Sequence, residues 1–338
     1  MSESNGATGG GIVVIGGGIS GLTTALEAAE AGHDVFLLER EPYLGGRVAR
    51  MREYFPKLCP PSCGLEINFR RLKQNPRVQI MTMAEVKQVE GKPGDFKVTV
   101  ELKPRRVNGN CTACDKCVPA CPVERPDDYN YGLGTTKAIY LPYKLCHPNH
   151  HVIDEAACLG ESCGKCLAYC PYDAIDLTEA PRTLTLNAAA VVVATGWKPY
   201  DASKLTNLGF GRLPDVVTNT MMERMAAKDG PTGGKIVRPS DGGPMRRVAF
   251  VQCAGSRDEH HLDYCSTVCC SATMKQVTYV REQYPDAEVH VFYIDIRTMG
   301  TLEDFFTRVK DDDKLFLHKG KVAKISRAAS NTMIITAE

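Results

Sequence analysis

The chain has 338 residues, enough for two modest domains or for one domain with an insertion. It contains 41 Lys and Arg residues against 40 Asp and Glu residues, so its charge gives no sign of a nucleic-acid partner or an anionic membrane surface. No apolar run approaches the roughly 18 residues that span a bilayer. Residues 1–10 lack the basic and apolar regions of a signal peptide. We expect a soluble, cytoplasmic protein without direct membrane insertion.

The first predicted elements form a βαβ unit. Residues 11–16 have the continuous apolar character of a buried parallel strand. TTALEAAEAGHDV predicts a helix that ends near Gly32, and VFLLER predicts the second strand. Further along, residues 86–103 predict a hairpin with GKPGD as its turn, and residues 183–197 return to a strand.

A second βαβ unit is predicted near the C-terminus. The Gly- and Pro-rich segment 230–244 predicts a linker. After it, RRVAFVQC predicts a strand, SATMKQVTYVREQYP a helix and AEVHVFYIDI another strand. Between the two units, residues 107–178 hold eight clustered cysteines and predict an insertion with little core of its own.

The glycine-rich turn after the first strand predicts a dinucleotide site. Glycines in a GxGxxG pattern permit a tight turn and bring a pyrophosphate against the N-terminus of the following helix. Glu39 lies 23 positions after Gly16, where a carboxylate binds a ribose hydroxyl and disfavours a 2′-phosphate. The alternative is a glycine turn in an unrelated α/β fold. The expected binding residues are Gly16, Gly18, Ile19, Ser20, Gly21 and Glu39.

Two further segments favour FAD over NAD. EPYLGGR follows Glu39, and VVVATGW completes a late predicted strand. This combination resembles the glutathione and thioredoxin reductase group, in which ERxxxLGGR and ATG segments contact FAD. That fold usually has another Gly-Asp or ATG segment near its C-terminus. This sequence ends at SNTMIITAE, so we expect a truncated sequence or a reduced C-terminal part of the flavin domain. The resemblance implies FAD contacts from Arg40, Gly45, Gly46, Arg47, Ala194, Thr195 and Gly196.

The fifteen cysteines, in a long chain, favour metal ligation over disulfides. CTACDKCVPACP, residues 111–122, matches the bacterial ferredoxin run, in which the fourth cysteine ligates the other cluster. CLGESCGKCLAYCP, residues 158–171, is its partner with a longer first gap. Zinc is the alternative metal. One predicted cluster takes Cys111, Cys114, Cys117 and Cys170, and the other takes Cys121, Cys158, Cys163 and Cys166.

A third group of cysteines lies in VQCAGSRDEHHLDYCSTVCC, residues 251–270, where a nicotinamide-binding domain would carry GxGxxG. Without these glycines the pyrophosphate cradle is lost, so we expect no direct binding of NAD(P)H. Four thiolates can hold a cluster instead, with a redox-active disulfide as the alternative. The candidate ligands are Cys253, Cys265, Cys269 and Cys270.

Other residues give weaker signals. Cys59 and Cys63, in LCPPSCG, are candidate redox thiols, although a structural role is the main expectation. His147, His150 and His151 fall in a predicted loop and are expected to be solvated or to pack.

Several longer segments point to one family. VQCAGSRDEHHLDYCSTVCC, GPTGGKIVRPSDG, FPKLCPPSCGLEINFRR and YPDAEVHVFYIDIR resemble the A subunit of heterodisulfide reductase. They also resemble the HdrA-like subunit of sulfur oxidisers and QmoA, a subunit of a quinone-interacting oxidoreductase. The resemblance implies an FAD-binding core, an inserted ferredoxin domain and a 4Fe–4S cluster near the flavin. It implies the cluster ligands Cys253, Cys265, Cys269 and Cys270.

We therefore predict an α/β flavoprotein with the thioredoxin/glutathione-reductase-like two-dinucleotide-binding-domain fold and an inserted ferredoxin-like domain. The predicted FAD-binding Rossmann-like domain comprises residues 1–106 and 179–229, the iron–sulfur insertion residues 107–178, and the second nucleotide-binding-like domain residues 230–338.

The predicted function is an FAD- and iron–sulfur-containing oxidoreductase subunit. It would relay electrons between flavin and 4Fe–4S clusters to partner subunits of a heterodisulfide-reductase-like complex in sulfur metabolism. We expect a homodimer. The alternatives are a QmoA-type subunit linked to adenylylsulfate reductase, a self-contained flavin disulfide reductase using Cys59 and Cys63, and a zinc-stabilised scaffold.

Overall fold

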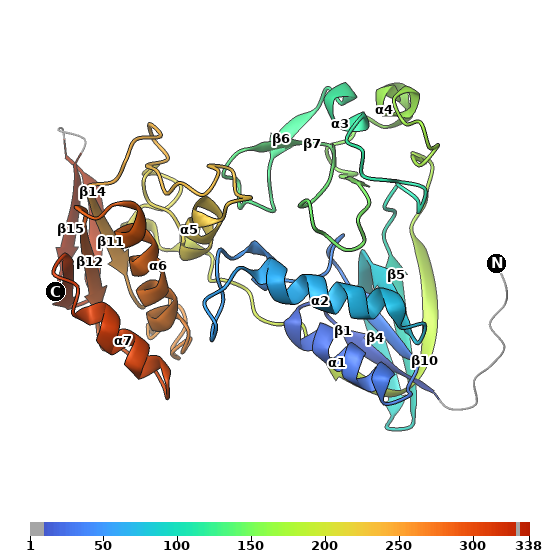
Figure 1. The fold of residues 1–338 in the computed structure, drawn as a ribbon, viewed down its shortest axis with the longest axis horizontal. Coiled ribbons are helices and arrows are strands. Elements are labelled where there is room, and N and C mark those ends of the chain that lie inside the picture. Colours follow the sequence, from blue (N-terminus) through green and yellow to red (C-terminus); the bar gives the residue numbers. More distant parts are fainter. Residues whose placement is uncertain (1–9, 329–331) are drawn as a thin grey trace. The chain divides into compact units, whose positions relative to one another are not determined.

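The computed structural model describes residues 10–328 and 332–338. The first nine residues, for which we predicted no signal peptide, lie outside the described residues, as do two residues of the C-terminal SNTMIITAE segment. The chain divides into two compact units, Met1–Trp197 and Lys198–Glu338 (Figure 1). In the described ranges, the helices are all too short or too polar to cross a bilayer.

The first unit is built on a six-stranded sheet with the order β3-β2-β1-β10-β5-β4. The strands β3, β2, β1 and β10 run parallel, and β5 and β4 continue the sheet antiparallel. The elements of this layer are β1 (Gly11–Ile15), α1 (Ile19–Glu30), β2 (Val35–Glu39), α2 (Pro61–Gln74), β3 (Val78–Thr82), β4 (Ala84–Lys92), β5 (Asp95–Leu102) and β10 (Arg182–Val193).

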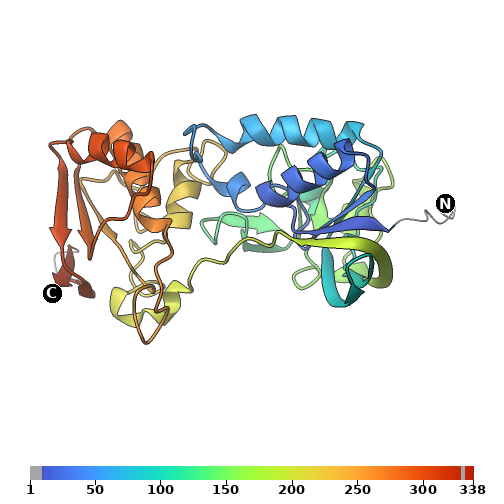
Figure 2. The same ribbon diagram turned by 90° about the horizontal axis from the view of Figure 1, so that it is seen from below.

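Both faces of the central strands are covered, which explains the apolar run in β1. Val14 packs on the side of α1 and α2 with Leu22 and Leu37. Val13 faces the opposite way and packs with Val98 of the β4–β5 hairpin. The two helices, blue in Figure 2, lie along one face of the sheet. A strand buried on both faces has no polar alternation, so its sequence is continuously hydrophobic.

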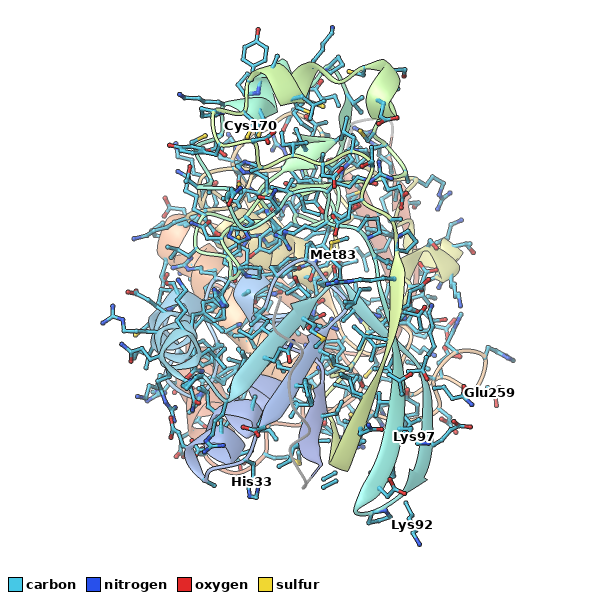
Figure 3. The ribbon with its side chains drawn as sticks, turned by 90° about the vertical axis from the view of Figure 1, so that its right-hand side faces the viewer. His33, Met83, Lys92, Lys97, Cys170 and Glu259 are labelled. Atoms are coloured by element: carbon cyan, nitrogen blue, oxygen red, sulfur yellow. The ribbon has the colours of Figure 1, made fainter. Side chains whose placement is uncertain are left out.

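The cysteine-rich insertion lies between β5 and β10 in the chain and has a small core. Its two ends are joined by a bridge between Val107 and Ile175. In Figure 3, Cys170 of the insertion and His33, which precedes β2, lie at opposite ends of the unit, with Met83 after β3 between them. The insertion therefore lies beyond the carboxyl ends of the parallel strands. Its elements are α3 (Cys117–Ala120), β6 (Glu124–Pro126), β7 (Thr135–Lys137), β8 (Ile139–Tyr140), β9 (Val152–Ile153) and α4 (Lys165–Ala168).

Aromatic residues fix the insertion against the loop that follows β2. Tyr43 of this loop packs edge-on against Tyr129 and Tyr143 of the insertion. The Tyr129 hydroxyl donates to the carbonyl of Ala49 at 2.8 Å, and the Tyr143 hydroxyl donates to the carbonyl of Leu44 at 3.0 Å. The insertion thus holds the backbone on both sides of the Gly-Gly-Arg segment.

The second unit contains a parallel three-stranded sheet with the order β11-β12-β13. Val289 and Val291 of the central strand are fully buried. A separate antiparallel pair, β14 and β15, packs through Val322 and Ile325. The elements are α5 (Asn219–Ala226), β11 (Arg247–Val251), α6 (Cys269–Gln283), β12 (Glu288–Tyr293), α7 (Leu302–Lys310), β13 (Leu315–Lys319), β14 (Val322–Arg327) and β15 (Met333–Ala337).

The division between the units differs from the predicted boundary. Residues 198–229, which we assigned to the FAD-binding domain, belong to the second unit. A cluster of apolar side chains attaches residues 200–216 to β14 and β15, and a buried polar contact joins α5 to α6. The Lys275 ammonium lies 3.1 Å from the Glu223 carboxylate, and the Gln276 amide donates to the same oxygen at 2.9 Å. Two charged residues give no local sign that they are buried together, so the sequence pattern missed this contact.

Candidate functional site

Backbone hydrogen bonds join three loops at the carboxyl end of β1. The N–H of Ala194, after β10, donates to the carbonyl of Ile15 at 2.8 Å. The N–H of Gly45 donates to the carbonyl of Gly17 at 2.8 Å. The loops expected to contact FAD are therefore adjacent in space.

The close approach of these loops requires glycine. A Cβ on Gly21 would lie 1.7 Å from the carbonyl oxygen of Gly16. A Cβ on Gly46, which has a φ of +56°, would lie 2.9 Å from the Cα of Gly18. Side chains at these positions would push the loops apart, so glycines are needed for the shape of the site itself.

The N-terminus of α1 is open on the side where a pyrophosphate would bind. Gly18 is the N-cap, no side chain caps the helix, and its first turn, which includes Ile19 and Ser20, has no acidic residue. A Cβ on Gly18 would meet no protein atom nearer than 3.9 Å. The first N–H groups are therefore available to an anion, and the residues present fit the pyrophosphate of FAD.

Glu39 lies at the end of β2 and is buried. Its carboxylate accepts hydrogen bonds from the N–H of Gly17 at 2.7 Å and from the N–H of Glu41 at 2.8 Å. Burial raises the pKa of Glu39, and the two backbone donors oppose this shift. The carboxylate is thus oriented beside the glycine turn. The side chain of neighbouring Arg40 is exposed, and its Nε lies 3.5 Å from the carboxylate of Glu41.

Arg47, which follows Gly46, packs against Trp197, the single tryptophan of the chain. The guanidinium carbon of Arg47 lies 3.8 Å from the centre of a Trp197 ring. Burial lowers the pKa of Arg47. Trp197 directly follows Ala194, Thr195 and Gly196, the segment expected to contact the flavin, and remains half exposed.

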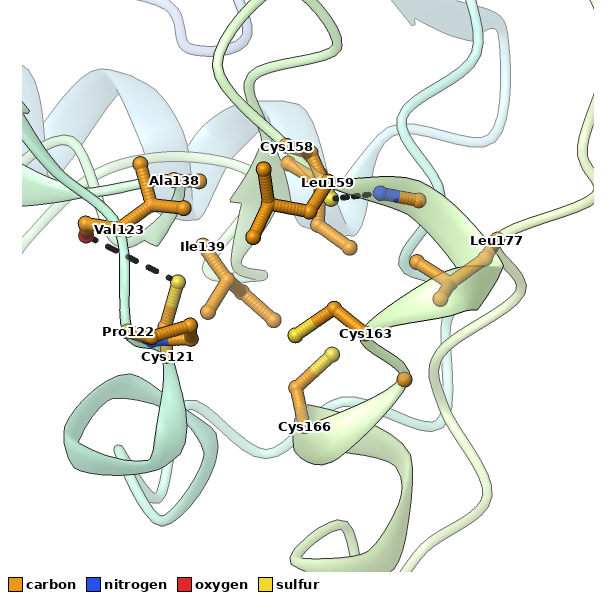
Figure 4. A pocket seen from close by; sticks show the side chains of 13 residues that line it. Cys121, Pro122, Val123, Ala138, Ile139, Cys158, Leu159, Cys163, Cys166 and Leu177 are labelled. Atoms are coloured by element: carbon orange, nitrogen blue, oxygen red, sulfur yellow. Dashed lines mark hydrogen bonds between the residues drawn. The ribbon is translucent and has the colours of Figure 1, made fainter.

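The insertion encloses two cavities, each lined by four cysteines. The sulfur atoms of Cys163 and Cys166 point into the first cavity (Figure 4). Ile139 lines both cavities. The first cavity is lined by Cys121, Cys158, Cys163 and Cys166, and the second by Cys111, Cys114, Cys117 and Cys170.

These cysteines surround a space instead of meeting at a point. In the described part of the chain, no three His, Cys, Asp or Glu side chains are placed to hold one metal ion together. Backbone N–H groups point to the sulfurs, with Gly160 donating to Cys158 and Ala174 donating to Cys170, each at 3.4 Å. Burial raises the pKa of Cys117 to about 12. Four thiols with N–H donors fit a metal–sulfur cluster, whose binding would release the thiol protons.

His151, which we expected to be solvated or to pack, lines the second cavity. Its side chain is almost completely buried. Nδ1 lies 3.5 Å from the sulfur of Cys111, and Nε2 lies 2.9 Å from the Asp115 carboxylate. Burial lowers the pKa of His151. These partners are 36 and 40 positions away in the chain, so no local pattern could reveal them.

The second unit brings its four cysteines together at the carboxyl end of β11. Cys253 follows the strand with a φ of +56°, and Cys269 and Cys270 begin α6. A hydrogen bond from Cys270 lowers the pKa of Cys269 to about 5. Cys265 and Cys269 are close enough to Cys253 to affect its charge, and burial raises the pKa of Cys253. The N–H of Thr267 donates to the sulfur of Cys265 at 3.4 Å.

Two buried polar atoms next to these ligands lack a partner among the described residues. They are Nε2 of Gln252, the neighbour of Cys253, and Oγ of Ser271, the neighbour of Cys270. Buried donors without a partner are costly. An inorganic sulfide would accept such hydrogen bonds, so this donor set fits a cluster.

Cys59 and Cys63 flank the start of α2. Pro61 occupies the first turn of this helix, a position that tolerates proline, so the proline pair precedes and begins the helix. Cys63 is exposed and Cys59 is half-buried, and both are free thiols. Burial and a hydrogen bond with Cys59 raise the pKa of Tyr54. The structure therefore places one phenol beside the two candidate thiols.

Comparison with known proteins agrees with the geometry of the glycine loops. Residues 11–51 match the family described as FAD dependent oxidoreductase. The chain therefore combines the predicted α/β fold with an FAD-binding oxidoreductase segment. FAD is its cofactor.

Over nearly its whole length, the chain belongs to the family of heterodisulfide reductase A subunits. It is 40% identical to the A subunit of Ferredoxin/F(420)H(2)-dependent CoB-CoM heterodisulfide reductase from Methanosarcina acetivorans, over 96% of this chain and 41% of that protein. It is 36% identical to the A subunit of H(2):CoB-CoM heterodisulfide,ferredoxin reductase from Methanothermobacter thermautotrophicus, over 96% and 50%. It is 38% identical to the iron-sulfur A subunit of CoB–CoM heterodisulfide reductase from Methanocaldococcus jannaschii, over 93% and 48%.

These matches confirm the family resemblance seen in the sequence. The chain spans about half the length, or less, of the curated relatives it matches. Among solved structures, thioredoxin reductase from Lactococcus lactis aligns with a TM-score of 0.45 and 10% identity, over 97% of this chain and 74% of that one. Thioredoxin reductase from T. acidophilum aligns with a TM-score of 0.44 and 11% identity, over 96% and 73%.

Proposed function

We propose that the chain is an FAD- and iron–sulfur-containing electron-transfer subunit of a heterodisulfide-reductase-like complex. The glycine loops and Glu39 would hold FAD, and the three cysteine groups would each hold a 4Fe–4S cluster. When bound, FAD exchanges electrons in pairs and each cluster carries one electron. A chain with both could pass electrons between a two-electron partner and a one-electron partner.

The main support for this proposal is the position of Cys121 and Cys170, each of which lines the cavity of the other cysteine run. Each cavity combines three cysteines of one run with the last cysteine of the other. Bacterial two-cluster ferredoxins share their ligands in this way. Four sulfurs arranged around one open space suit a cluster of several metal atoms. A single zinc ion would instead draw all four sulfurs to about 2.3 Å from one point.

The residues of the chain would control how these clusters exchange electrons. Ile139 lines both cavities of the insertion, so an apolar side chain would lie between the two proposed clusters. The N–H donors of Gly160 and Ala174 would stabilise the thiolate ligands and influence the reduction potentials. The insertion also packs on the loop that carries Gly46. This contact would hold the insertion, with its proposed clusters, against the proposed flavin site.

Substrate chemistry would take place on partner subunits. The names of the relatives refer to a CoB–CoM heterodisulfide, which supports a disulfide or another sulfur compound as the terminal substrate. We extend the proposal to sulfur metabolism, including sulfur oxidation, and to a homodimer in the cytoplasm. A QmoA-type subunit linked to adenylylsulfate reductase is the main alternative, and co-purification with a membrane partner would favour it.

The test is the content of iron, acid-labile sulfide and flavin in protein purified without oxygen, together with EPR of the reduced sample. We expect about twelve irons per FAD, four for each cluster. Protein with FAD and no iron would overturn the proposal. Four irons per FAD would restrict it to one cluster.

A further inference from the structure

The proposed cluster site of the second unit contains a group of charges that the proposed function does not yet use. Arg257 lies four residues after Cys253, and its positive charge opposes the rise in the pKa of the Cys253 thiol that burial causes. The guanidinium of Arg257 forms an ion pair with the carboxylate of Asp295. Asp295 also accepts a hydrogen bond from Nε of Arg297 at 2.8 Å.

The backbone of the same segment contacts a second proposed ligand. The sulfur of Cys270 lies 4.0 Å from the carbonyl oxygen of Asp295. The backbone at Arg297 opposes the strong rise in the pKa of the Cys270 thiol, which a hydrogen bond with Cys269 and burial cause. Asp295 follows β12 as Cys253 follows β11, so the charged segment and the cysteines meet at the carboxyl edge of the same parallel sheet. This edge is the usual place for a ligand in such sheets.

We infer that Arg257 and Asp295 set the reduction potential of the proposed cluster, Arg257 raising it and Asp295 lowering it. The inference rests on the proposed function, because it requires a cluster on these cysteines. A cluster becomes more negative when it is reduced, so a nearby positive charge stabilises the reduced state and a nearby carboxylate destabilises it. Both are positioning residues that act through the ligands and the local field.

The loop has enough other anchors to keep its fold when one charge is removed. The backbone N–H of Arg257 donates to the carbonyl of Tyr264 at 3.1 Å. Asp258 pairs with Lys321 at 2.7 Å. Further along, the Tyr200 hydroxyl lies 2.6 Å from Nδ1 of His261. The side chain of Arg257 is about a quarter exposed, so its field is only partly screened by solvent.

The test measures the midpoint potential of this cluster by EPR in the cofactor-loaded, full chain. The signal is assigned as the one that disappears in Cys265→Ala. In Arg257→Met, we expect the ratio of reduced to oxidised cluster at a fixed solution potential to fall about tenfold, the effect of removing one unit charge a few ångströms away. This equals about 59 mV for a one-electron couple. Asp295→Asn should change the ratio in the opposite direction, and Arg257→Lys should remain near the wild type.

The opposite signs separate an electrostatic role from a structural one. If the ion pair served only to hold the loop, Arg257→Met and Asp295→Asn would break the same contact and have the same effect. Arg238→Met, which removes a charge from an exposed pair in the same unit, is the matched control and should leave the potential unchanged. Unchanged potentials in both variants would overturn the inference while leaving the proposed function intact. Absence of any Cys265-dependent signal would overturn the proposed cluster itself.

Discussion

Replacement of Gly18 by alanine should separate FAD binding from folding. The Gly18 backbone has a φ of −76°, which alanine adopts without strain. A Cβ there would lie 3.9 Å from its nearest neighbour, the Cα of Gly46, which is ordinary van der Waals contact. Alanine is a poorer N-cap than glycine by about 0.5–1 kcal/mol. It also restricts the unfolded chain, which is worth about 0.4–1 kcal/mol in the opposite direction. The two effects nearly cancel, so we expect the Tm of the apoprotein to change by less than about 3 °C.

The same methyl group would occupy the space proposed for the pyrophosphate. Loss of one or two hydrogen bonds from N–H groups to the charged phosphate would cost about 1.5–3 kcal/mol each. We therefore expect Kd for FAD to rise at least tenfold, because about 1.4 kcal/mol corresponds to a factor of ten. Calorimetric titration of the apoprotein with FAD measures this change.

Two control variants distinguish the mechanism. Gly109→Ala adds a methyl group with no atom within 4 Å and should change neither Tm nor Kd. Gly21→Ala places a Cβ 1.7 Å from a backbone oxygen and should lower both stability and FAD binding. The reasoning is refuted if Gly18→Ala binds FAD within about twofold of the wild type, since no ligand group would then occupy this space.

Three other variants or titrations test separate parts of the account. Cys170→Ser should remove the EPR signal of the cluster that also needs Cys114 and leave the signal that needs Cys163. Loss of the Cys163-dependent signal instead would contradict the proposal that each cluster takes its fourth ligand from the other run. Binding of FAD should quench the emission of Trp197, the only tryptophan in the chain, and unchanged emission would place the flavin elsewhere. Cys63→Ser should leave the cluster content and the FAD content unchanged. If the isolated chain reduces disulfides and this variant does not, the self-contained disulfide reductase is favoured instead.

The sequence predicted the features that depend on local patterns. The glycine turn is visible because the close approach of backbones around Gly21 tolerates no side chain. The continuous apolar run of β1 is visible because both sides of Val13 and Val14 are buried. The grouping of the insertion cysteines follows from the spacing of the two ferredoxin runs, since the fourth cysteine of each run is directed to the other site.

Contacts between distant segments could not be read in the same way. Arg257 and Asp295 are 38 positions apart, and each looks like an ordinary surface charge in the sequence. Glu223 and Lys275 have the same appearance, yet they are buried together and attach α5 to the second unit. A buried ion pair depends on tertiary geometry that no local pattern records.

The central claim is that one chain combines a two-electron flavin with one-electron clusters, and the number of electrons it accepts tests this claim most directly. Protein loaded with its cofactors would be titrated without oxygen using a calibrated reductant, with flavin absorbance and cluster EPR recorded together. The account predicts an uptake of about five electrons per FAD, two by the flavin and one by each of three clusters. An uptake of about two electrons, complete when the flavin is reduced, would contradict it.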